Sequence, residues 1–373
     1  MSLDLIRDAQ RLAADGKRAE AEAVFARVTE ARDDADALIA YAWFLVHDGR
    51  LPQATSLLHE AIDVARKQGY PLGEADASGV AGNILLLQGD LDGAERLYRD
   101  ALEIHERMDD PGGIANALRS LGDILHSRGD LDGAEQMHRD ALEIDERLGD
   151  LQAQAGDCQN LGAVLASRGD FDGAERMFRK ALEISRTLGD AGGQADQYGN
   201  LGLILRERGD LEGAEAMNRQ ALEMELQAGR VERQASHYGN LGMVLLERGD
   251  LEGAEEMQRK ALEIDERLGR IEGQALRHGN LGNVRFMRGD LAGAEQAYRK
   301  TLELHERLGR VQGLVNAYHN LGVVLWNQGD LAGAARMYAS ELTLAEELGA
   351  PHIAERARAA LESARQAAAS HGA

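Results

Sequence analysis

Apolar residues recur at helical intervals in two consecutive halves of a unit that residues 193–230 represent well. In the first half, Tyr198, Leu201 and Leu205 follow one another at intervals of three and four, with Gly202 on the same side. This spacing predicts one buried stripe along a helix. A second apolar series marks one side of the other half: Ala214, Met217, Ala221, Leu222 and Met224. Each unit therefore predicts two amphipathic helices.

A Gly-Asp pair separates the two predicted helices. Glycine at a helix C-terminus adopts the left-handed conformation without a Cβ penalty, and the following aspartate can accept hydrogen bonds from the first amides of the next helix. The pair recurs every 40 residues: Gly89-Asp90, Gly129-Asp130, Gly169-Asp170, Gly209-Asp210, Gly249-Asp250, Gly289-Asp290 and Gly329-Asp330. A period of this length indicates one supersecondary unit stacked on copies of itself. We expect an all-α solenoid that works through a long surface.

The repeats become less regular toward the N-terminus. Counting back from Gly89, the equivalent glycines are Gly49 and Gly16, which lie 40 and then 33 residues earlier. Terminal repeats diverge because one flank meets solvent. We predict three parts along the chain: two divergent repeats in residues 1–70, seven regular repeats in residues 75–350, and a capping helix with a frayed tail in residues 351–373. The expected fold is an α-α superhelix of about nine helix-turn-helix repeats with a C-terminal capping helix.

Glycine also recurs inside the first turn of the second helix, as at Gly213. Glycine destabilises a helix by about 0.5 to 1 kcal/mol relative to alanine. We expect a close approach of two helix backbones to compensate for this loss. The equivalent positions are Gly93, Gly133, Gly173, Gly253, Gly293 and Gly333.

Charged residues follow the same period. Glu215 and Arg219 form one of several i,i+4 pairs in the favourable orientation, each worth about 0.2 to 0.5 kcal/mol. An arginine such as Arg208 precedes the glycine that ends the first helix, where a cation complements the helix dipole. We interpret these charges as the solvated faces of helices.

Net charge and cysteine content restrict the function. The 42 lysines and arginines against 64 aspartates and glutamates give a formal net charge of −22, which disfavours nucleic acid as a partner and favours a basic or apolar peptide segment. The single cysteine, Cys158, excludes an intramolecular disulfide, and the first residues lack the features of a signal peptide. No stretch approaches the roughly 18 apolar residues of a membrane span. We expect a cytoplasmic protein that does not enter a membrane.

The frame of residues 198–222 resembles the tetratricopeptide repeat. The resemblance rests on Tyr198, Leu201-Gly202, Leu205, Gly209, Ala214 and Ala221-Leu222, and it recurs through the regular repeats. The 40-residue form, with Asn-Leu-Gly in the first helix, is similar to the repeat arrays of kinesin light chains, of Pins-type spindle adaptors and of many bacterial signalling proteins. This resemblance implies a right-handed superhelix whose first helices line a concave groove for an extended peptide or a partner helix.

The implied groove changes in character along the chain. Two early repeats contribute the stripe residues Asp76, Gly79, Asn83, Leu86 and Leu87, and then Asn116, Arg119, Asp123, His126 and Ser127. Toward the C-terminus the stripe becomes apolar, and exposed apolar surface commonly marks an interaction site. We predict that these stripe residues contact the partner: Arg206, Met243, Leu246, Asn283, Phe286, Met287, His319, Val323 and Trp326. The alternative is that these side chains pack on one another or hold the C-terminal tail.

A ladder of asparagines lies beside this stripe, at Asn160, Asn200, Asn240, Asn280 and Asn320. An amide side chain can donate to and accept from a peptide backbone, so a row of amides can hold an extended chain without reading its sequence. The same amides can instead bond to neighbouring helices and fix the packing between repeats. Both interpretations stay open. Val80 and Ser120 replace the asparagine in the two preceding repeats.

No motif for catalysis or for a cofactor occurs. The phosphate-binding loop, the zinc-binding helix and the nucleophile elbow are all absent from the sequence. His237, His278 and His319 lie near the groove at differing helical positions, so we expect no metal site. We interpret Cys158 as a buried structural thiol. The chain is therefore not expected to be an enzyme or to bind a cofactor.

The sequence favours a non-enzymatic scaffold or adaptor, monomeric or weakly self-associating, that binds an unidentified protein or peptide partner in its concave groove. A regulatory sensor whose superhelix responds to a peptide or a small molecule is the first alternative. A self-assembling structural repeat protein is the second.

Overall fold

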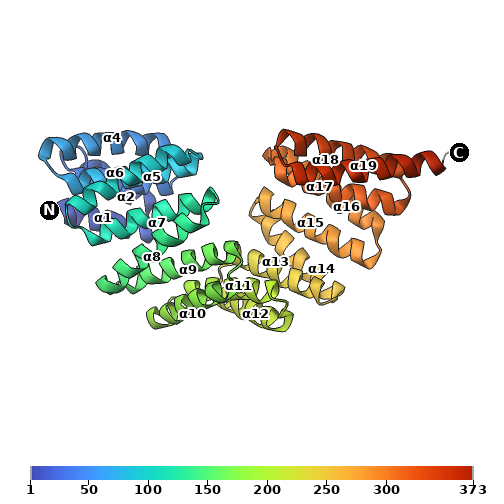
Figure 1. Ribbon diagram of the computed structural model, residues 1–373. Helices are drawn as coiled ribbons and strands as arrows, with labels where there is room; N and C mark the ends of the chain where they lie inside the picture. The colour runs from blue at the N-terminus through green and yellow to red at the C-terminus, as the bar shows by residue number, and fades with distance from the viewer. Residues whose placement is uncertain (1, 372–373) are drawn as a thin grey trace. The chain divides into compact units, whose positions relative to one another are not determined.

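The computed structural model describes residues 2–371, which form 19 α-helices and, within that range, no strand (Figure 1). The chain divides into two compact units, Met1–Gly189 and Asp190–Ala373. The helices of the first unit are α1 (Ser2–Ala14), α2 (Arg18–Val28), α3 (Ala35–His47), α4 (Leu51–Gln68), α5 (Pro71–Gln88), α6 (Leu91–Arg107), α7 (Pro111–Ser127), α8 (Leu131–Leu148), α9 (Leu151–Arg168) and α10 (Phe171–Leu188). Those of the second unit are α11 (Ala191–Glu207), α12 (Leu211–Gln227), α13 (Val231–Glu247), α14 (Leu251–Arg267), α15 (Ile271–Arg288), α16 (Leu291–Leu308), α17 (Val311–Gln328), α18 (Leu331–Glu347) and α19 (Pro351–His371).

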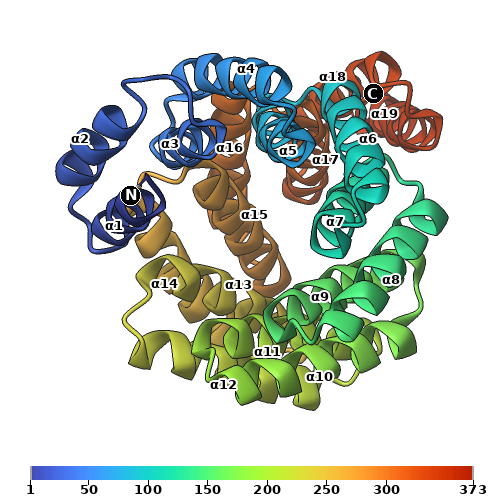
Figure 2. The same ribbon diagram turned by 90° about the vertical axis from the view of Figure 1, so that its left-hand side faces the viewer.

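Consecutive helices pack as pairs, from α1 with α2 to α17 with α18, as Figures 1 and 2 show for each unit. We call the odd-numbered helix of each pair its A helix and the even-numbered helix its B helix. The last helix, α19, packs against α18. The described helices thus confirm the predicted all-α fold of helix pairs with a C-terminal helix. The end of the tail, for which we expect fraying, lies outside the described residues.

The Gly-Asp pair ends one helix and begins the next, as predicted. Gly209 has a φ of 81°, and the Asp210 carboxylate accepts a hydrogen bond of 2.9 Å from the amide of Gly213 at the start of α12. This N-cap satisfies an amide that the helix itself leaves without a partner. Capping of this kind fixes where the B helices of the regular repeats begin, from α6 to α18, whereas α2 and α4 begin without a side-chain cap.

The expected reason for the glycine in the first turn of the B helix is wrong. A Cβ added at Gly213 would lie 2.5 Å from Oδ2 of Asp210, and the three atoms nearest to it all belong to that side chain. The glycine therefore leaves room for the capping carboxylate, and no second helix backbone approaches it. Stabilisation by the cap, typically about 1 kcal/mol, offsets the low helix propensity of glycine.

A different glycine, in the middle of each A helix from α5 to α17, fixes how the two helices of a pair meet. A Cβ on Gly82 would lie 2.8 Å from the Tyr98 ring of α6, and a Cβ on Gly162 would lie 2.7 Å from the Phe178 ring of α10. The absence of a side chain at these positions lets a large B-helix side chain lie directly on the A helix. The equivalent contacts are Gly122 with His138, Gly202 with Asn218, Gly242 with Gln258, Gly282 with Tyr298 and Gly322 with Tyr338.

The arginines before the terminating glycines do more than complement a helix dipole. Arg128, at the end of α7, pairs with Glu95 on α6, 33 residues earlier. In the last regular repeat, Gln328 takes a comparable place and donates to Glu295 over 3.0 Å. The same ion pair between consecutive repeats recurs as Arg168 with Glu135, Arg248 with Glu215 and Arg288 with Glu255. Because Glu95 also pairs with Arg99, one glutamate links its own helix to the following repeat.

None of the described helices has both the length and the apolar content that crossing a bilayer requires.

Replacing His138 by phenylalanine should make the first unit less sensitive to acid. His138 is 1% exposed and neither ring nitrogen makes a hydrogen bond within the described residues, so burial lowers its pKa from 6.5 to about 4. Below about pH 6.5 the unfolded chain gains a proton that the folded ring accepts only near pH 4, so stability is lost as the pH falls through this window. At pH 5 this loss amounts to about 2 kcal/mol. Urea unfolding of wild type and His138→Phe at pH 7 and pH 5 measures the difference.

Phenylalanine suits this position because Phe178 lies on Gly162 as His138 lies on Gly122. An equal loss of stability between pH 7 and pH 5 in both proteins would contradict the assignment of the acid sensitivity to His138.

Two glycines on α5 should respond in opposite ways to alanine. A Cβ on Gly79 meets no atom within 4 Å, so Gly79→Ala should stabilise the chain by about 0.5 to 1 kcal/mol through helix propensity. A Cβ on Gly82 would overlap the Tyr98 ring, so Gly82→Ala should destabilise it by about 1 to 3 kcal/mol. Urea unfolding of the two variants tests both signs, and a loss of stability in Gly79→Ala would show that the space beside it is filled.

Candidate binding site on the first unit

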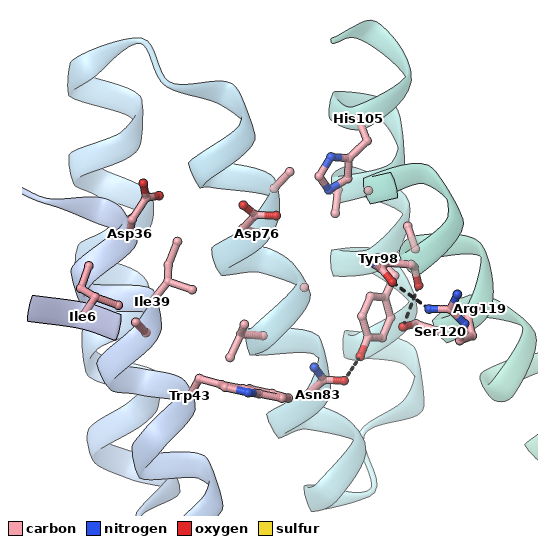
Figure 3. Close-up of a pocket in the computed structure, with 18 of the residues that line it drawn as sticks. Ile6, Asp36, Ile39, Trp43, Asp76, Asn83, Tyr98, His105, Arg119 and Ser120 are labelled. Atoms are coloured by element: carbon pink, nitrogen blue, oxygen red, sulfur yellow. Dashed lines mark hydrogen bonds between the residues drawn. The ribbon is translucent and has the colours of Figure 1, made fainter. Parts of the chain in front are cut away.

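The A helices α1, α3, α5 and α7 line a cavity of about 720 Å³ in the first unit, with α6 contributing part of the wall (Figure 3). Each A helix presents residues at intervals of three and four, which lie on one face of a helix. On α3 these are Asp36, Ile39, Ala40 and Trp43, and on α5 they are Asp76, Gly79, Val80 and Asn83. Because the repeat is 40 residues long, Asp36 and Asp76 occupy equivalent positions on neighbouring helices, as do Trp43 and Asn83.

Two small residues lie at the cavity where α5 meets α7. Gly79 and Ala117, 38 residues apart, both line it. At the same pair of positions in the second unit, His237 lies 3.0 Å from the Cβ position of Gly199, and the Arg277 guanidinium covers Gly239. A large side chain thus fills the space beside the glycine in those repeats. Alanine at position 117 leaves it open.

One end of the cavity is acidic. Figure 3 shows Asp36 and Asp76 at the same level, with the His105 ring directed toward Asp76. A hydrogen bond from Tyr70 reaches Asp36, and burial together with the charge of Asp36 raises the pKa of Tyr70 to about 12. Desolvation raises the pKa of Asp76; His105 opposes this rise, and the negative charges of Asp110 and Asp36 add to it. In the described part of the chain Asp76 takes part in no ion pair.

The other end is apolar and holds an exposed tryptophan. Trp43 is 42% exposed, and Ile39 and Val80 line the cavity close to it. The Trp43 ring meets His47 edge to face, with centroids 4.8 Å apart. Beside Trp43, Oδ1 of Asn83 accepts a hydrogen bond of 2.7 Å from the Tyr98 hydroxyl. This bond fixes the orientation of the Asn83 side-chain amide (Figure 3).

The wall formed by α7 carries a guanidinium that is already paired. Arg119 makes contacts of 2.7 Å with the carboxylates of Asp145 and Asp157, and it also donates to Asn116 over 2.7 Å. Asp157 is fully buried, so the pair with Arg119 compensates a carboxylate that would otherwise be costly. Arg119 is therefore paired within the repeat stack, and its charge also opposes the rise that burial causes in the pKa of Asp123, another residue of the lining.

Several predicted stripe residues lie in this cavity. Asp76, Gly79, Asn83, Arg119 and Asp123 line it together with Asn116, as the stripe on the first helices implied. Sequence reasoning missed the contribution of α1 and α3, including Ile6, Arg7, Asp36 and Trp43. The signal was available, because subtracting one period of 40 residues from Asp76 and Asn83 gives Asp36 and Trp43.

The predicted site residues of the second unit lie on its A helices. They are Asn200 and Arg206 on α11, Asn240, Met243 and Leu246 on α13, Asn280, Asn283, Phe286 and Met287 on α15, and His319, Asn320, Val323 and Trp326 on α17. Asn160 belongs to the first unit, on α9, where it donates to Asp123 over 3.2 Å.

The amides of the second unit differ in what they bind. Asn280 is 9% exposed and donates to Gln258 over 3.3 Å, and Asn200 donates to Gln197 over 3.4 Å. By contrast, within the described residues Asn240 and Asn320 make no side-chain hydrogen bond. The two interpretations of the asparagine ladder therefore apply at different positions. Asn280 contributes to packing, whereas the side-chain amides of Asn240 and Asn320 are available to a binding partner.

Two stripe side chains of the second unit have their hydrogen-bonding groups engaged inside the fold. Asn283 accepts a hydrogen bond of 2.6 Å from the Tyr298 hydroxyl, and His319 lies 3.0 Å from the fully buried Glu341. Arg206 is paired with Glu207 over 2.7 Å. Asn283 and His319 therefore link an A helix to its B helix, and Arg206 pairs with a neighbour at the end of its own helix.

The apolar stripe of the second unit is partly exposed. Met287 is 65% exposed and Trp326 is 37% exposed, and the stripe residue Leu276 adds a side chain that is 53% exposed. Phe286 packs instead against the core formed by α16, α17 and α18. Met243, Leu246 and Val323 are half-buried. The exposed apolar surface is therefore concentrated on α15 and α17.

No group of three metal-ligating side chains gathers among the described residues. Cys158 is buried, and desolvation raises the pKa of its thiol to about 11, so it is a poor nucleophile near neutral pH. The structural interpretation of this cysteine is confirmed.

Solved structures of other proteins share the fold. The STAND protein with a tetratricopeptide repeat sensor from Pyrococcus horikoshii gives a TM-score of 0.66 at 18% identity, covering 81% of this chain and 46% of its own. A Rap protein complexed with Competence and Sporulation Factor gives 0.59 at 15% identity and covers 98% of both chains. BtubC (BKLC) from P. vanneervenii gives 0.53 at 24% identity, covering 59% of this chain and 92% of its own. At these identities the likeness establishes the fold alone.

No curated protein sequence matches the chain significantly. Models of tetratricopeptide repeats, however, match most of its length. A MalT-like TPR region matches residues 10–190, and two tetratricopeptide repeat models match residues 194–224 and residues 233–347. These matches agree with the glycine-capped helix pairs of both units. The chain belongs to the tetratricopeptide repeat proteins.

Proposed function

We propose that this chain is a non-catalytic interaction module that binds an extended segment of a partner protein across the A helices of its first unit. The observation that carries the proposal is the cavity of about 720 Å³ that four consecutive A helices line. Its volume falls within the range of about 300 to 1,000 Å³ that ligand sites occupy. A surface built from several repeats suits a segment that contacts each helix in turn.

The lining supplies both kinds of contact that such a segment needs. Ile39, Val80 and Trp43 offer apolar surface, and a tryptophan that is only partly buried is a common anchor in protein interfaces. Gln10 and Asn116 carry amides that can pair with a peptide backbone. Gly79 lets a bound chain approach α5 closely, because no side chain projects there.

The second unit offers a further face for the same partner or for another one. Asn240 and Asn320 provide free amides on α13 and α17, and Met287 and Trp326 provide exposed apolar side chains. Exposed apolar residues beside hydrogen-bonding groups resemble the composition of a recognition surface.

The similar structures fit a protein-interaction or regulatory role. One of them is a Rap protein complexed with Competence and Sporulation Factor, and another carries a tetratricopeptide repeat sensor. A regulatory sensor is therefore the second candidate. Small-angle scattering with and without the partner distinguishes the two, because a sensor changes its dimensions on binding and a passive module does not.

Blocking the cavity with a single side chain should prevent the partner from binding. Gly79→Leu places a bulky apolar group in open space and replaces a poor helix former, so the fold should be retained. Quantitative mass spectrometry of proteins captured by the immobilised chain should show a specific partner depleted about tenfold or more with this variant.

The matched control is Gly156→Leu on α9, because a Cβ there also meets no atom within 4 Å and the residue does not line the cavity. Identical sets of captured proteins for wild type, Gly79→Leu and Gly156→Leu would rule out the cavity as the binding site.

The amides of the second unit should separate into binding and packing groups. Asn240→Ala and Asn320→Ala together should change the free energy of unfolding by less than about 0.5 kcal/mol, since neither side chain has an internal partner, and should weaken partner binding. Asn280→Ala should lower stability by about 1 kcal/mol, because Oε1 of Gln258 loses its hydrogen-bond donor. Urea unfolding and partner affinity are the two measurements. Unchanged affinity in the double variant would exclude this face from binding.

A further inference from the structure

We propose that the cavity of the first unit selects a segment in which a cationic side chain, an ammonium or a guanidinium, lies near a large apolar one, the cation between Asp36 and Asp76 and the apolar group against Ile39 and Trp43. This inference rests on the proposed function, since it names the chemistry of the segment that binds there.

The acids at this end of the cavity are exposed, and neither forms a salt bridge within the described residues. Asp36 interacts with the neutral hydroxyl of Tyr70. Arg119, on the wall formed by α7, is bound to Asp145 and Asp157. Together with Arg7 on α1 it makes two cations in the lining against three carboxylates once Asp123 is included. The lining thus carries an excess of negative charge beside an apolar surface.

The imidazole at this end adds an independent feature. His105 is 5% exposed, and Figure 3 shows its ring directed toward Asp76. Its Nδ1 lies 2.8 Å from Oδ2 of Asp110 without hydrogen-bond geometry, and it faces Gly113 of α7. The imidazole thus adds a buried polar group to the acidic end of the cavity.

The two ends have a defined separation. Asp36 and Trp43 are seven residues apart on α3, which corresponds to about 10 Å along the helix axis. An extended peptide rises about 3.3 Å per residue, so a cation and an apolar side chain three residues apart span the same distance. Ile39 lies between the two ends and can support a shorter spacing.

The charge of the whole chain acts in the same direction. A net charge of −22 creates a negative potential that accelerates the approach of cationic segments and repels acidic ones. Desolvation, and to a lesser extent the charges of Asp110 and Asp36, raise the pKa of Asp76, and a cation placed between the two carboxylates would favour its ionised form. An acidic segment would instead place like charges together in the cavity.

The experiment uses tryptophan fluorescence, because the chain has only two tryptophans and they lie in different units. In the full-length Trp326→Phe variant, Trp43 reports on the cavity. The probes are three acetylated and amidated hexapeptides that are otherwise all serine. The first has lysine at the second position and leucine at the fifth, the second replaces that lysine with glutamate, and the third replaces the leucine with serine.

We expect the lysine-leucine peptide to change Trp43 emission in a saturable way, and the glutamate and leucine-free peptides to bind about tenfold more weakly or less. Asp76→Asn should weaken the lysine-leucine peptide about tenfold, because it removes one carboxylate while keeping the shape. Asp63→Asn, which removes an exposed acid of α4 outside the cavity, should leave the affinity unchanged. Gly79→Leu should abolish the response with both acids still present, and circular dichroism should show each variant folded.

Equal affinity for the lysine and glutamate peptides, no effect of Asp76→Asn, or no change of Trp43 emission with any peptide would overturn the inference. None of these results removes the proposed function, which depends on whether Gly79→Leu loses the captured partner while Gly156→Leu keeps it. Trp43→Phe leaves Trp326 as the reporter of the second unit. A response of Trp326 with none at Trp43 would place cation recognition on the second unit and also overturn the inference.

Discussion

Direct contact between a glycine of each A helix from α5 to α17 and a large side chain of its B helix is the constraint on which the regular repeats depend. At Gly82, Gly162 and Gly322 an aromatic ring occupies the space where a Cβ would lie. This contact sets the rotation of both helices about their axes, because only one face of the A helix lacks side chains at that level. Once the rotation is set, the stripe at intervals of three and four on the opposite face has to point away from the B helix.

Stacking of the pairs then follows from smaller interactions that repeat with the period. The Asp caps fix where the B helices of the regular repeats begin, and the arginine at the end of an A helix reaches back to a glutamate of the preceding B helix. An exposed ion pair contributes little by itself, but Glu95 is 9% exposed and bonds to two arginines, so it is a better-defined contact than a surface pair. The period of 40 residues makes consecutive A helices equivalent, and Asp36 and Asp76 occupy the same position on α3 and α5.

The cavity arises where this regular stack lacks side chains to fill it. In the second unit the space beside the equivalent glycines takes His237 and Arg277, and the polar atoms of Arg277 are compensated by Asp265, 3.3 Å away. The first unit has alanine at the matching position, and the space beside Gly79 is open.

The sequence by itself determined the helix pairs, their period and the residues at which the helices end and begin. Capping and helical periodicity are local, because they depend on residues within a few positions of one another. It also predicted the stripe that includes Asp76, Gly79 and Asn83, since side chains seven residues apart share a helix face. Only the tertiary structure decided why position 213 is occupied by glycine, which asparagine amides have no internal hydrogen bond, and where the stripe lines a cavity. Those answers depend on the meeting of residues such as Gly79 and Ala117, 38 positions apart, and on which neighbour reaches into the space between two helices. In a repeated sequence such neighbours occupy equivalent positions. The differences between their side chains affect the structure only once the helices are packed.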